Sequence, residues 1–289
     1  MVIELAAIPD VQSLPDTRNL SIDRVGIRDI RQPVRIADRS GDEHPSIGTF
    51  SMYVQLAPEV KGTHMSRFVE ILEEHPGVYS LETFPELVRE VAARLESERC
   101  EVEMHFSYFM KKAAPVTGIT GTLDFEVMLA AVLDGDRLTE QLRVQVPVTS
   151  LCPCSKTISE YGAHNQRSHV IATVELTEPF WIEDMIELLE DKGSCQLYPL
   201  LKRPDEKHVT EEAYENPKFV EDIARDVAVA FNEDGRIGRF HVTVENFESI
   251  HNHSAFAEIT GGDPEAAARL IPSSNGASSN GSNGSNGTH

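Results

Sequence analysis

Two thiols and two imidazoles lie in one polar stretch of this sequence, between residues 150 and 170. Cys152 and Cys154 flank a proline, and His164 follows ten to twelve residues later. Thiolate and imidazole are the side chains that bind Zn²⁺ and related cations. Because Cys-x-Cys is a weaker motif than Cys-x-x-Cys, a small buried pair of cysteines beside a hydrogen-bonded loop histidine is the alternative interpretation. The stretch nevertheless contains the residue types of a metal site.

The segments on either side predict that this stretch is a connection between strands. In Leu142–Val148, apolar residues alternate with polar residues or proline, which is the period of a strand with one buried face. A second alternating run begins near Ser168. The polar connection between them is about twenty residues long, and loops of that length are more often functional than idle.

Three further polar clusters interrupt the apolar pattern. Lys61–Arg67 precedes an expected helix, whose first N–H groups and dipole favour anions. Lys202–His208 forms a charged loop, followed by Glu221 on the next helix. Ser249–Ser254 links the last two strands, and its His251 could complete a metal shell with a cysteine and a histidine. Solvated surface residues are the alternative interpretation of each cluster taken alone.

Composition limits the class of protein. The formal net charge of −21 argues against nonspecific nucleic-acid binding, which needs an excess of lysine and arginine. A salt-adapted source would also explain the acidity. The longest apolar run, Val127–Leu133, is far shorter than the ~20 residues of a membrane helix. With 4 cysteines and no signal-peptide pattern, we expect a reduced, cytoplasmic protein that has no membrane partner.

The periodic segments predict an α+β protein built from two similar halves. Each half has the order strand–strand–helix–helix–strand–strand, which indicates antiparallel sheets covered on one face by helices. We place the first half, with an N-terminal arm, in residues 1–136, and the second, which carries the metal site, in residues 137–265. The Ser/Asn/Gly-rich tail, residues 266–289, is expected to be disordered because it has almost nothing to bury. The expected strands are Arg24–Ile36, Gly48–Leu56, Glu101–Met110, Ile119–Leu133, Leu138–Val148, Ser168–Leu176, Arg239–Phe247 and Ser254–Ile259. Helices are expected around Phe68, from Thr83, from Trp181 and from Asn216-Pro217. Thr83 and Glu86 have the spacing of a capping box.

Three motifs in this sequence resemble the type IB GTP cyclohydrolases, the prokaryotic enzymes that open folate and related pterin synthesis. They are Cys152–Lys156 together with Gly162–Ser168, the run Lys61–Arg67, and Val25–Ile27. The resemblance spans roughly residues 8–262. It implies the tunnelling fold, with two ββααββ modules in each chain, and homotetramers whose active sites lie at subunit interfaces.

The resemblance also implies a reaction, in which GTP and water give 7,8-dihydroneopterin triphosphate and formate, and it implies the residues that carry it out. Cys152 matches the cysteine that the family treats as catalytic, and His164 matches its histidine metal ligand. By position, Glu206 and His251 match the remaining metal ligands, and Glu221 matches the glutamate that anchors the purine. The family uses a divalent metal that is not strictly zinc: Mn²⁺ is often preferred, and archaeal relatives use Fe²⁺.

The residue types suit this chemistry. Attack of water on C8 of guanine needs activation, and a bound metal lowers the pKa of its water toward ~7. A carboxylate can accept two guanine N–H groups at once. Four basic residues are candidates to neutralise the triphosphate: Lys61, Arg67, Lys156 and Arg167. Three residues are unranked candidates for the later acid–base step: Cys154, His169 and His253.

Three other functions are alternatives to this reaction. An archaeal type of cyclohydrolase on the same fold makes a cyclic phosphate product. A sister family reduces a nitrile through a nucleophilic cysteine, but it expects a different cysteine context and an NADPH motif that is not evident here. A noncatalytic purine- or metal-binding module is the alternative from another class, and formate release from GTP separates it from any cyclohydrolase.

Overall fold

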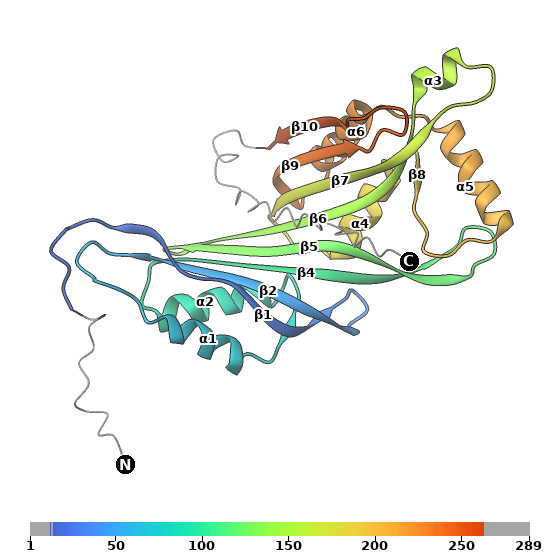
Figure 1. Cartoon of the computed structure of the whole chain (residues 1–289). Coiled ribbons are helices and arrows are strands. Elements are labelled where there is room, and N and C mark those ends of the chain that lie inside the picture. Colours follow the sequence, from blue (N-terminus) through green and yellow to red (C-terminus); the bar gives the residue numbers. More distant parts are fainter. Residues whose placement is uncertain (1–11, 13, 263–289) are drawn as a thin grey trace, which may run out of the picture.

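The strands of the chain join edge to edge in one 10-stranded sheet (Figure 1). The computed structural model describes Gln12 and residues 14–262, so most of the expected arm and the whole expected tail lie outside the described residues. The strand order is β10-β9-β7-β6-β5-β4-β2-β1-β3, and β8 pairs with β6 off this path. The strands are β1 Ile22–Ala37, β2 Glu43–Leu56, β3 Val78–Tyr79, β4 Arg99–Ala113, β5 Thr120–Asp134, β6 Arg137–Leu151, β7 Asn165–Leu176, β8 Cys195–Gln196, β9 Ile237–Asn246 and β10 Ala255–Gly261.

The pairings are antiparallel except for the short contact between β1 and β3, which is parallel. Helices connect or follow the strands, and none in the described residues is long and apolar enough to cross a membrane. The mixed α+β class predicted from the sequence is therefore confirmed. The helices are α1 Met65–Glu74, α2 Phe84–Arg94, α3 Pro153–Ile158, α4 Ile182–Asp191, α5 Arg203–Glu215 and α6 Val220–Glu233.

One hydrophobic core runs along one face of the sheet. Successive side chains on a strand point to opposite faces, so paired residues of neighbouring strands share a face. Val144, Ala172 and Val242 are aligned in this way across β6, β7 and β9, and all three are fully buried. The buried residues of α1, α2, α4 and α6 belong to the same core. The prediction that helices cover one face is thus confirmed for these four helices.

The two predicted halves are not separate sheets. β5 and β6 pair continuously from Glu126 and Gln145 to Asp134 and Arg137. The predicted boundary at residue 136 falls in the two-residue turn between them, where Gly135 has a φ of 58°. Glycine tolerates this left-handed conformation without steric cost. The division into modules stays a prediction.

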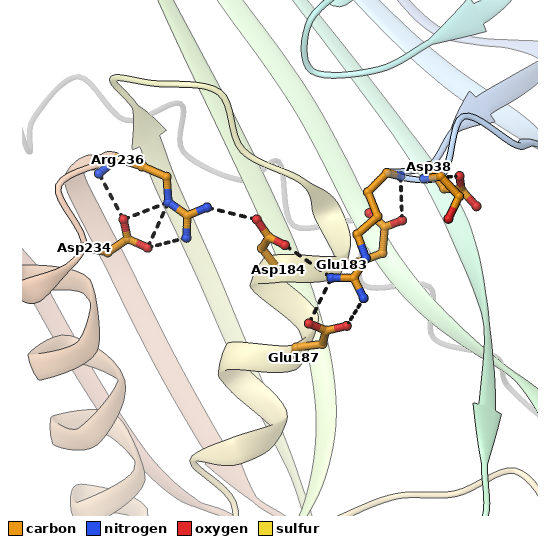
Figure 2. Close-up of polar contacts among 8 residues, drawn as sticks. Asp38, Glu183, Asp184, Glu187, Asp234 and Arg236 are labelled. Atoms are coloured by element: carbon orange, nitrogen blue, oxygen red, sulfur yellow. Dashed lines mark hydrogen bonds and ion pairs between the residues drawn. The ribbon is translucent and has the colours of Figure 1, made fainter.

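Contacts between Arg39 and α4 tie the two halves together, and Figure 2 shows the partners Glu183, Asp184 and Glu187 on that helix. Arg39 lies in the turn between β1 and β2, and its backbone N–H donates to Glu183 of α4 at 3.0 Å. Its guanidinium bonds Glu187 at 3.1 Å. Next to it, Arg236 donates to Asp184 of the same helix at 3.0 Å. A hairpin of the first half is therefore fixed to a helix of the second.

Two helices lie where the sequence predicted loops. Helix α5 occupies the charged segment that begins at Lys202, and it was missed because only Asp205 and Ala213 on it are buried. It therefore has no apolar stripe to give a helical period. The short helix α3 lies inside the expected polar connection, with Pro153 at its first position. Proline suits that position because its missing N–H has no helical partner there.

The predicted helix start at Asn216-Pro217 was wrong, whereas the start at Thr83 is confirmed by α2, although the expected capping box does not form. Asn216 does not cap α6: it follows α5, and its side chain donates to the carbonyls of Gly193 and Ser194 at 3.0 and 3.2 Å. Helix α6 begins at Val220, after Phe219 donates its N–H to Asp222 at 3.0 Å. Thr83 does not form the expected capping box, because its hydroxyl accepts from Ser80 N–H at 3.0 Å instead.

Candidate active site

The structure brings Cys152 and His164 together at the end of β6. The N–H of Cys152 donates to the carbonyl of His164 at 3.1 Å. Ser155, in the first turn of α3, donates its N–H to the Cys152 thiol at 3.4 Å and accepts from the N–H of His164 at 3.2 Å. Figure 1 shows α3 beyond the end of the sheet, where the chain turns from β6 into β7. The thiol and the imidazole are thus presented on one short loop.

A polar chain of side chains leads from His164 into the sheet. The Nδ1 atom of His164 is 3.0 Å from Oε1 of Gln166, and Nε2 of Gln166 donates to the Ser150 hydroxyl at 2.8 Å. Ser168 donates to the same hydroxyl at 2.8 Å. Gln166, Ser150 and Ser168 are all buried. They occupy the inward positions that Val148 and Val170 occupy nearer the middle of β6 and β7.

Sequence reasoning did not single out Gln166, Ser150 and Ser168 as functional, although a signal was present. In β6 and β7 the inward positions are apolar until the strands approach the polar connection, where they become Ser150, Gln166 and Ser168. A buried polar group costs free energy unless it is hydrogen-bonded, so polar residues in the inward phase indicate a network. Asn246, which pairs with Ser168 across the sheet, continues this pattern, and its Oδ1 is buried with no partner among the described residues.

Cys152 is the best placed of the four cysteines for chemistry. Burial raises the pKa of the Cys100 and Cys195 thiols to about 12, so both are protonated at neutral pH and are poor nucleophiles or ligands. Cys154 is exposed on α3. All four thiols are free. The half-buried Cys152 alone is held beside a histidine.

The other two predicted metal ligands are not grouped with this pair in one chain. Glu206 is exposed in the first turn of α5, and His251 is exposed in the loop between β9 and β10, stacked on His253 with 5.1 Å between ring centroids. Among the described residues there is no cluster of three or more His, Cys, Asp or Glu side chains that could hold a metal ion. The loop of His251 does reach the site, because the Ser249 hydroxyl lies 3.3 Å from Nδ1 of His164.

Arg167 and His169 lie on the opposite face of the sheet from Gln166. They alternate with buried residues along β7 and line a hollow of about 370 Å³ with Gln145 and Tyr198. Burial lowers the pKa of His169, so its ring is mostly neutral at pH 7. Its ring also packs edge-on against Phe247 at 4.8 Å. These two predicted residues therefore do not share one pocket with Cys152 within a single chain.

Lys156 and Glu221 both lie close to the Cys152 loop. Lys156, on α3, donates to the carbonyl of Tyr214 at the end of α5 and lies over its ring, 4.3 Å from the centroid. Glu221 is exposed in the first turn of α6. The approach to that helix is fixed beside the cysteine, because Lys218 N–H donates to the carbonyl of Leu151 at 3.0 Å.

Lys61–Arg67 lies at the other end of the sheet. Arg67 donates to the carbonyl of Arg94 at 3.2 Å, and residues 62–64 with Arg67 line a hollow of about 430 Å³ that also contains Glu98. The backbone carbonyl of Glu98 accepts from Gly135 N–H at 2.9 Å, which places this hollow beside the start of β6. The 15 residues of β6 extend over roughly 45 Å at about 3.3 Å per residue. Cys152 follows its far end.

The fold and the site together define a class, an α+β protein whose antiparallel sheet ends in a thiol–imidazole site. Within it, the chain belongs to the type I GTP cyclohydrolase FolE2 family (GCHY-1), whose model matches residues 8–257. This confirms the resemblance at the level of the family.

Close relatives are named GTP cyclohydrolase FolE2. The chain is 55% identical to the protein from Halorhodospira halophila over 250 residues, covering 86% of this chain and 96% of the relative. It is also 55% identical to the protein from Nitrosomonas eutropha over 253 residues, covering 87% and 95%. Among solved structures, uricase from Arthrobacter globiformis is similar with a TM-score of 0.48 and 8% identity, covering 83% of this chain and 93% of that one.

Proposed function

We propose that this chain is a type IB GTP cyclohydrolase, which converts GTP and water to 7,8-dihydroneopterin triphosphate and formate at the start of folate synthesis. The family assignment gives the reaction class. The observation that carries the proposal is the placement of Cys152 against His164, the two residues that the family motif makes catalytic, at a hydrogen-bonded distance of 3.1 Å between their backbones.

The donor set fits a divalent cation in part. Cys152 and His164 offer a thiolate and an imidazole nitrogen, which suit Zn²⁺ and, for the imidazole, Mn²⁺ or Fe²⁺ as well. We propose that Glu206 and His251 complete the shell, brought in by movement of their exposed segments or from a second subunit. The chemistry that such a cation supplies when bound is hydroxide at neutral pH, because coordination lowers the pKa of water toward ~7.

The remaining residues bind and orient the substrate in this proposal. Glu221 accepts the N–H groups of guanine and fixes C8 near the site, since a carboxylate offers acceptors only. Lys61, Arg67, Lys156 and Arg167 neutralise the triphosphate. The candidates for the acid–base group remain Cys154, His169 and His253. Of the three, His169 is mostly neutral at pH 7 and is therefore available as a base.

The register of the sheet supports an assembly of several chains. Lys61–Arg67 and Cys152 lie at opposite ends of β6, roughly 45 Å apart along the strand. If both bind one GTP molecule, two copies of the chain must contribute to each site. We propose the homotetramer with interface active sites, in which each chain contributes two ββααββ modules of the tunnelling fold. A cytoplasmic location is proposed with it.

The proposal is tested by incubating metal-stripped protein with GTP and one divalent cation at a time. Pterin fluorescence and formate release are followed together. Formation of both with at least one cation is the expected result, and absence of formate with every cation would leave a noncatalytic purine- or metal-binding module. Phosphate analysis of the product separates the linear triphosphate that we expect from the cyclic phosphate of the archaeal reaction.

A further inference from the structure

The hydrogen-bond chain behind His164 has no place in the residue set proposed above. It consists of Gln166, Ser150 and Ser168, and all three are at least nine-tenths buried. It contacts only one nitrogen of the imidazole, Nδ1, which is 3.0 Å from the Gln166 carbonyl oxygen Oε1. In the described part of the chain, Nε2 of His164 has no hydrogen-bond partner.

The direction of the Gln166 amide determines which imidazole nitrogen carries the proton. A neutral imidazole has one N–H donor and one acceptor nitrogen, while an amide has an acceptor oxygen and a donor nitrogen. Because Oε1 faces the ring and can only accept, Nδ1 must donate. Because Nε2 of Gln166 donates to the Ser150 hydroxyl at 2.8 Å, the amide is held at its other end as well. The imidazole Nε2 is then left as an unprotonated acceptor.

We propose that Gln166 is a positioning residue that holds His164 in its Nδ1–H tautomer, so that Nε2 is free to bind a cation. This inference rests on the proposed function for the identity of the ligand. Partners that orient a histidine ligand through its second nitrogen commonly raise metal affinity, and their loss costs about 10–100-fold. Ser150 and Ser168 act one step further away, because they fix the amide rather than the ring.

The reversed amide makes the opposite prediction. If Nε2 of Gln166 faced His164, the Ser150 hydroxyl would donate to Oε1, and Nδ1 of the ring would have to accept. His164 would then carry its proton on Nε2, where the proton would block the cation. The two arrangements have almost the same shape but place the ring proton on different nitrogens, which makes them distinguishable by spectroscopy.

The first experiment measures the tautomer of His164 directly, in metal-free full-length protein. Nitrogen-15 NMR of the ring, at a pH at which it is neutral, should show the Nδ1–H form. Gln166→Glu should show the same form, because a carboxylate also accepts from Nδ1–H. An Nε2–H ring in the unsubstituted protein would overturn the proposal, as would a change of tautomer in Gln166→Glu.

The second experiment measures Zn²⁺ affinity by competition with a chromophoric chelator. Gln166→Leu should bind Zn²⁺ about 10–100-fold more weakly, and Gln166→Glu should stay within a few-fold of the unsubstituted protein. Gln32→Leu is the control, since Gln32 also bonds a side chain, Glu73 at 2.8 Å, but on β1. Unchanged affinity in a folded Gln166→Leu protein would contradict the role. If Gln166→Leu does not fold, the tautomer of His164 and the Zn²⁺ affinity of Gln166→Glu still test the proposal. Neither the NMR measurement nor the Zn²⁺ affinity depends on GTP turnover.

Discussion

Thr117 binds both carboxylate oxygens of Asp205. Its N–H donates to Oδ1 at 2.8 Å and its hydroxyl donates to Oδ2 at 2.7 Å. Val116 and Lys202 add backbone N–H bonds at 2.9 Å each. Asp205 has no solvent exposure, so a carboxylate at the start of α5 fixes that helix to the turn between β4 and β5. It sits next to Glu206, whose position it therefore sets.

Asp205→Asn should lower the melting temperature at neutral pH, and the deficit should shrink in acid. Burial alone would raise the pKa of Asp205, but the bonds from Thr117, Lys202 and Val116 outweigh it and hold the pKa well below its usual range. A carboxyl with a depressed folded-state pKa stabilises the fold above its unfolded pKa of ~3.9, and that stability is lost as pH falls through the folded value.

Melting curves from pH 7 down to pH 3 test this dependence. Asp191→Asn is the control, because Asp191 is a largely exposed carboxylate that pairs with Lys192 at 2.8 Å. Its melting temperature should follow that of the unsubstituted protein at every pH. If the difference in melting temperature between Asp205→Asn and the unsubstituted protein stays constant from pH 7 to pH 3, the carboxylate charge is not its cause.

Removing one partner of the ion pair between Lys112 and Glu190 should lower the free energy of unfolding strongly, whereas replacing both partners by apolar residues should lower it little. Their side chains are 9% and 3% exposed, and they join β4 to α4. Burial lowers the pKa of Lys112 and raises that of Glu190, and each partner opposes that shift in the other. Removing one partner of a buried pair leaves an uncompensated charge, which costs about 3–5 kcal/mol, whereas an apolar pair of similar volume is often nearly neutral.

Denaturant unfolding of three variants checks this. Lys112→Met and Glu190→Leu should each lose about 3–5 kcal/mol, and Lys112→Met/Glu190→Leu should lose much less than the sum of the two. Additive losses in the double variant would mean that the two side chains do not interact in solution. Tyr198, whose ring centroid is 4.7 Å from Nζ of Lys112, is kept in all three variants.

The sheet was largely predictable because its inward phase is regular. Val144 and Val146 alternate with outward residues along β6, and the same period continues through β7 and β9. The helix α5 was not predictable in this way, because what it buries is the carboxylate of Asp205 and a single alanine. Its position depends on hydrogen bonds to Val116 and Thr117, almost ninety residues away in sequence.

The candidate site was predictable in part for the same reason. Cys152 and His164 could be selected from residue type and motif, and the structure brings them together. The joining of β5 to β6 in one sheet, which separates Arg67 from Cys152, follows from the two-residue turn at Gly135 and Asp136, a local hairpin signal that the division into two halves did not use. The role of Gln166 depends on the direction of one amide, which residue types alone leave open.

Cys152→Ala should abolish Zn²⁺ binding and GTP turnover while leaving the fold intact. Its thiol is at the cap of α3 and next to His164, so its loss removes a ligand and little packing. Cys154→Ala should be milder for metal binding, because Cys154 is exposed on helix α3, whereas Cys152 is the N-cap of that helix beside His164. Metal analysis and circular dichroism check both; full metal occupancy in a folded Cys152→Ala protein would rule out the assignment.

Glu221→Gln should retain metal but lose at least ~10-fold in kcat/KM for GTP. The amide replaces one acceptor by a donor, so one guanine N–H is left unpaired, at a cost on the order of 1–3 kcal/mol. Glu233→Gln, at the exposed last position of α6, is the matched control and should keep full activity. Loss of metal with unchanged GTP affinity in Glu221→Gln would exchange its role with that of Glu206.

Two inactive variants should restore activity to each other if each site is shared between chains. Cys152→Ala removes the thiol at one end of β6, and Arg67→Ala removes the cation at the other end, roughly 45 Å away. Within one chain these residues cannot contact the same GTP molecule. In a mixed assembly, some interfaces receive an intact Arg67 from one copy and an intact Cys152 from another. The two variants are unfolded together, refolded as a mixture, and compared with each refolded alone. Activity above both single samples is the expected result. A mixture as inactive as its components, when each exchanges subunits freely, would mean that Arg67 does not act at the Cys152 site of another chain.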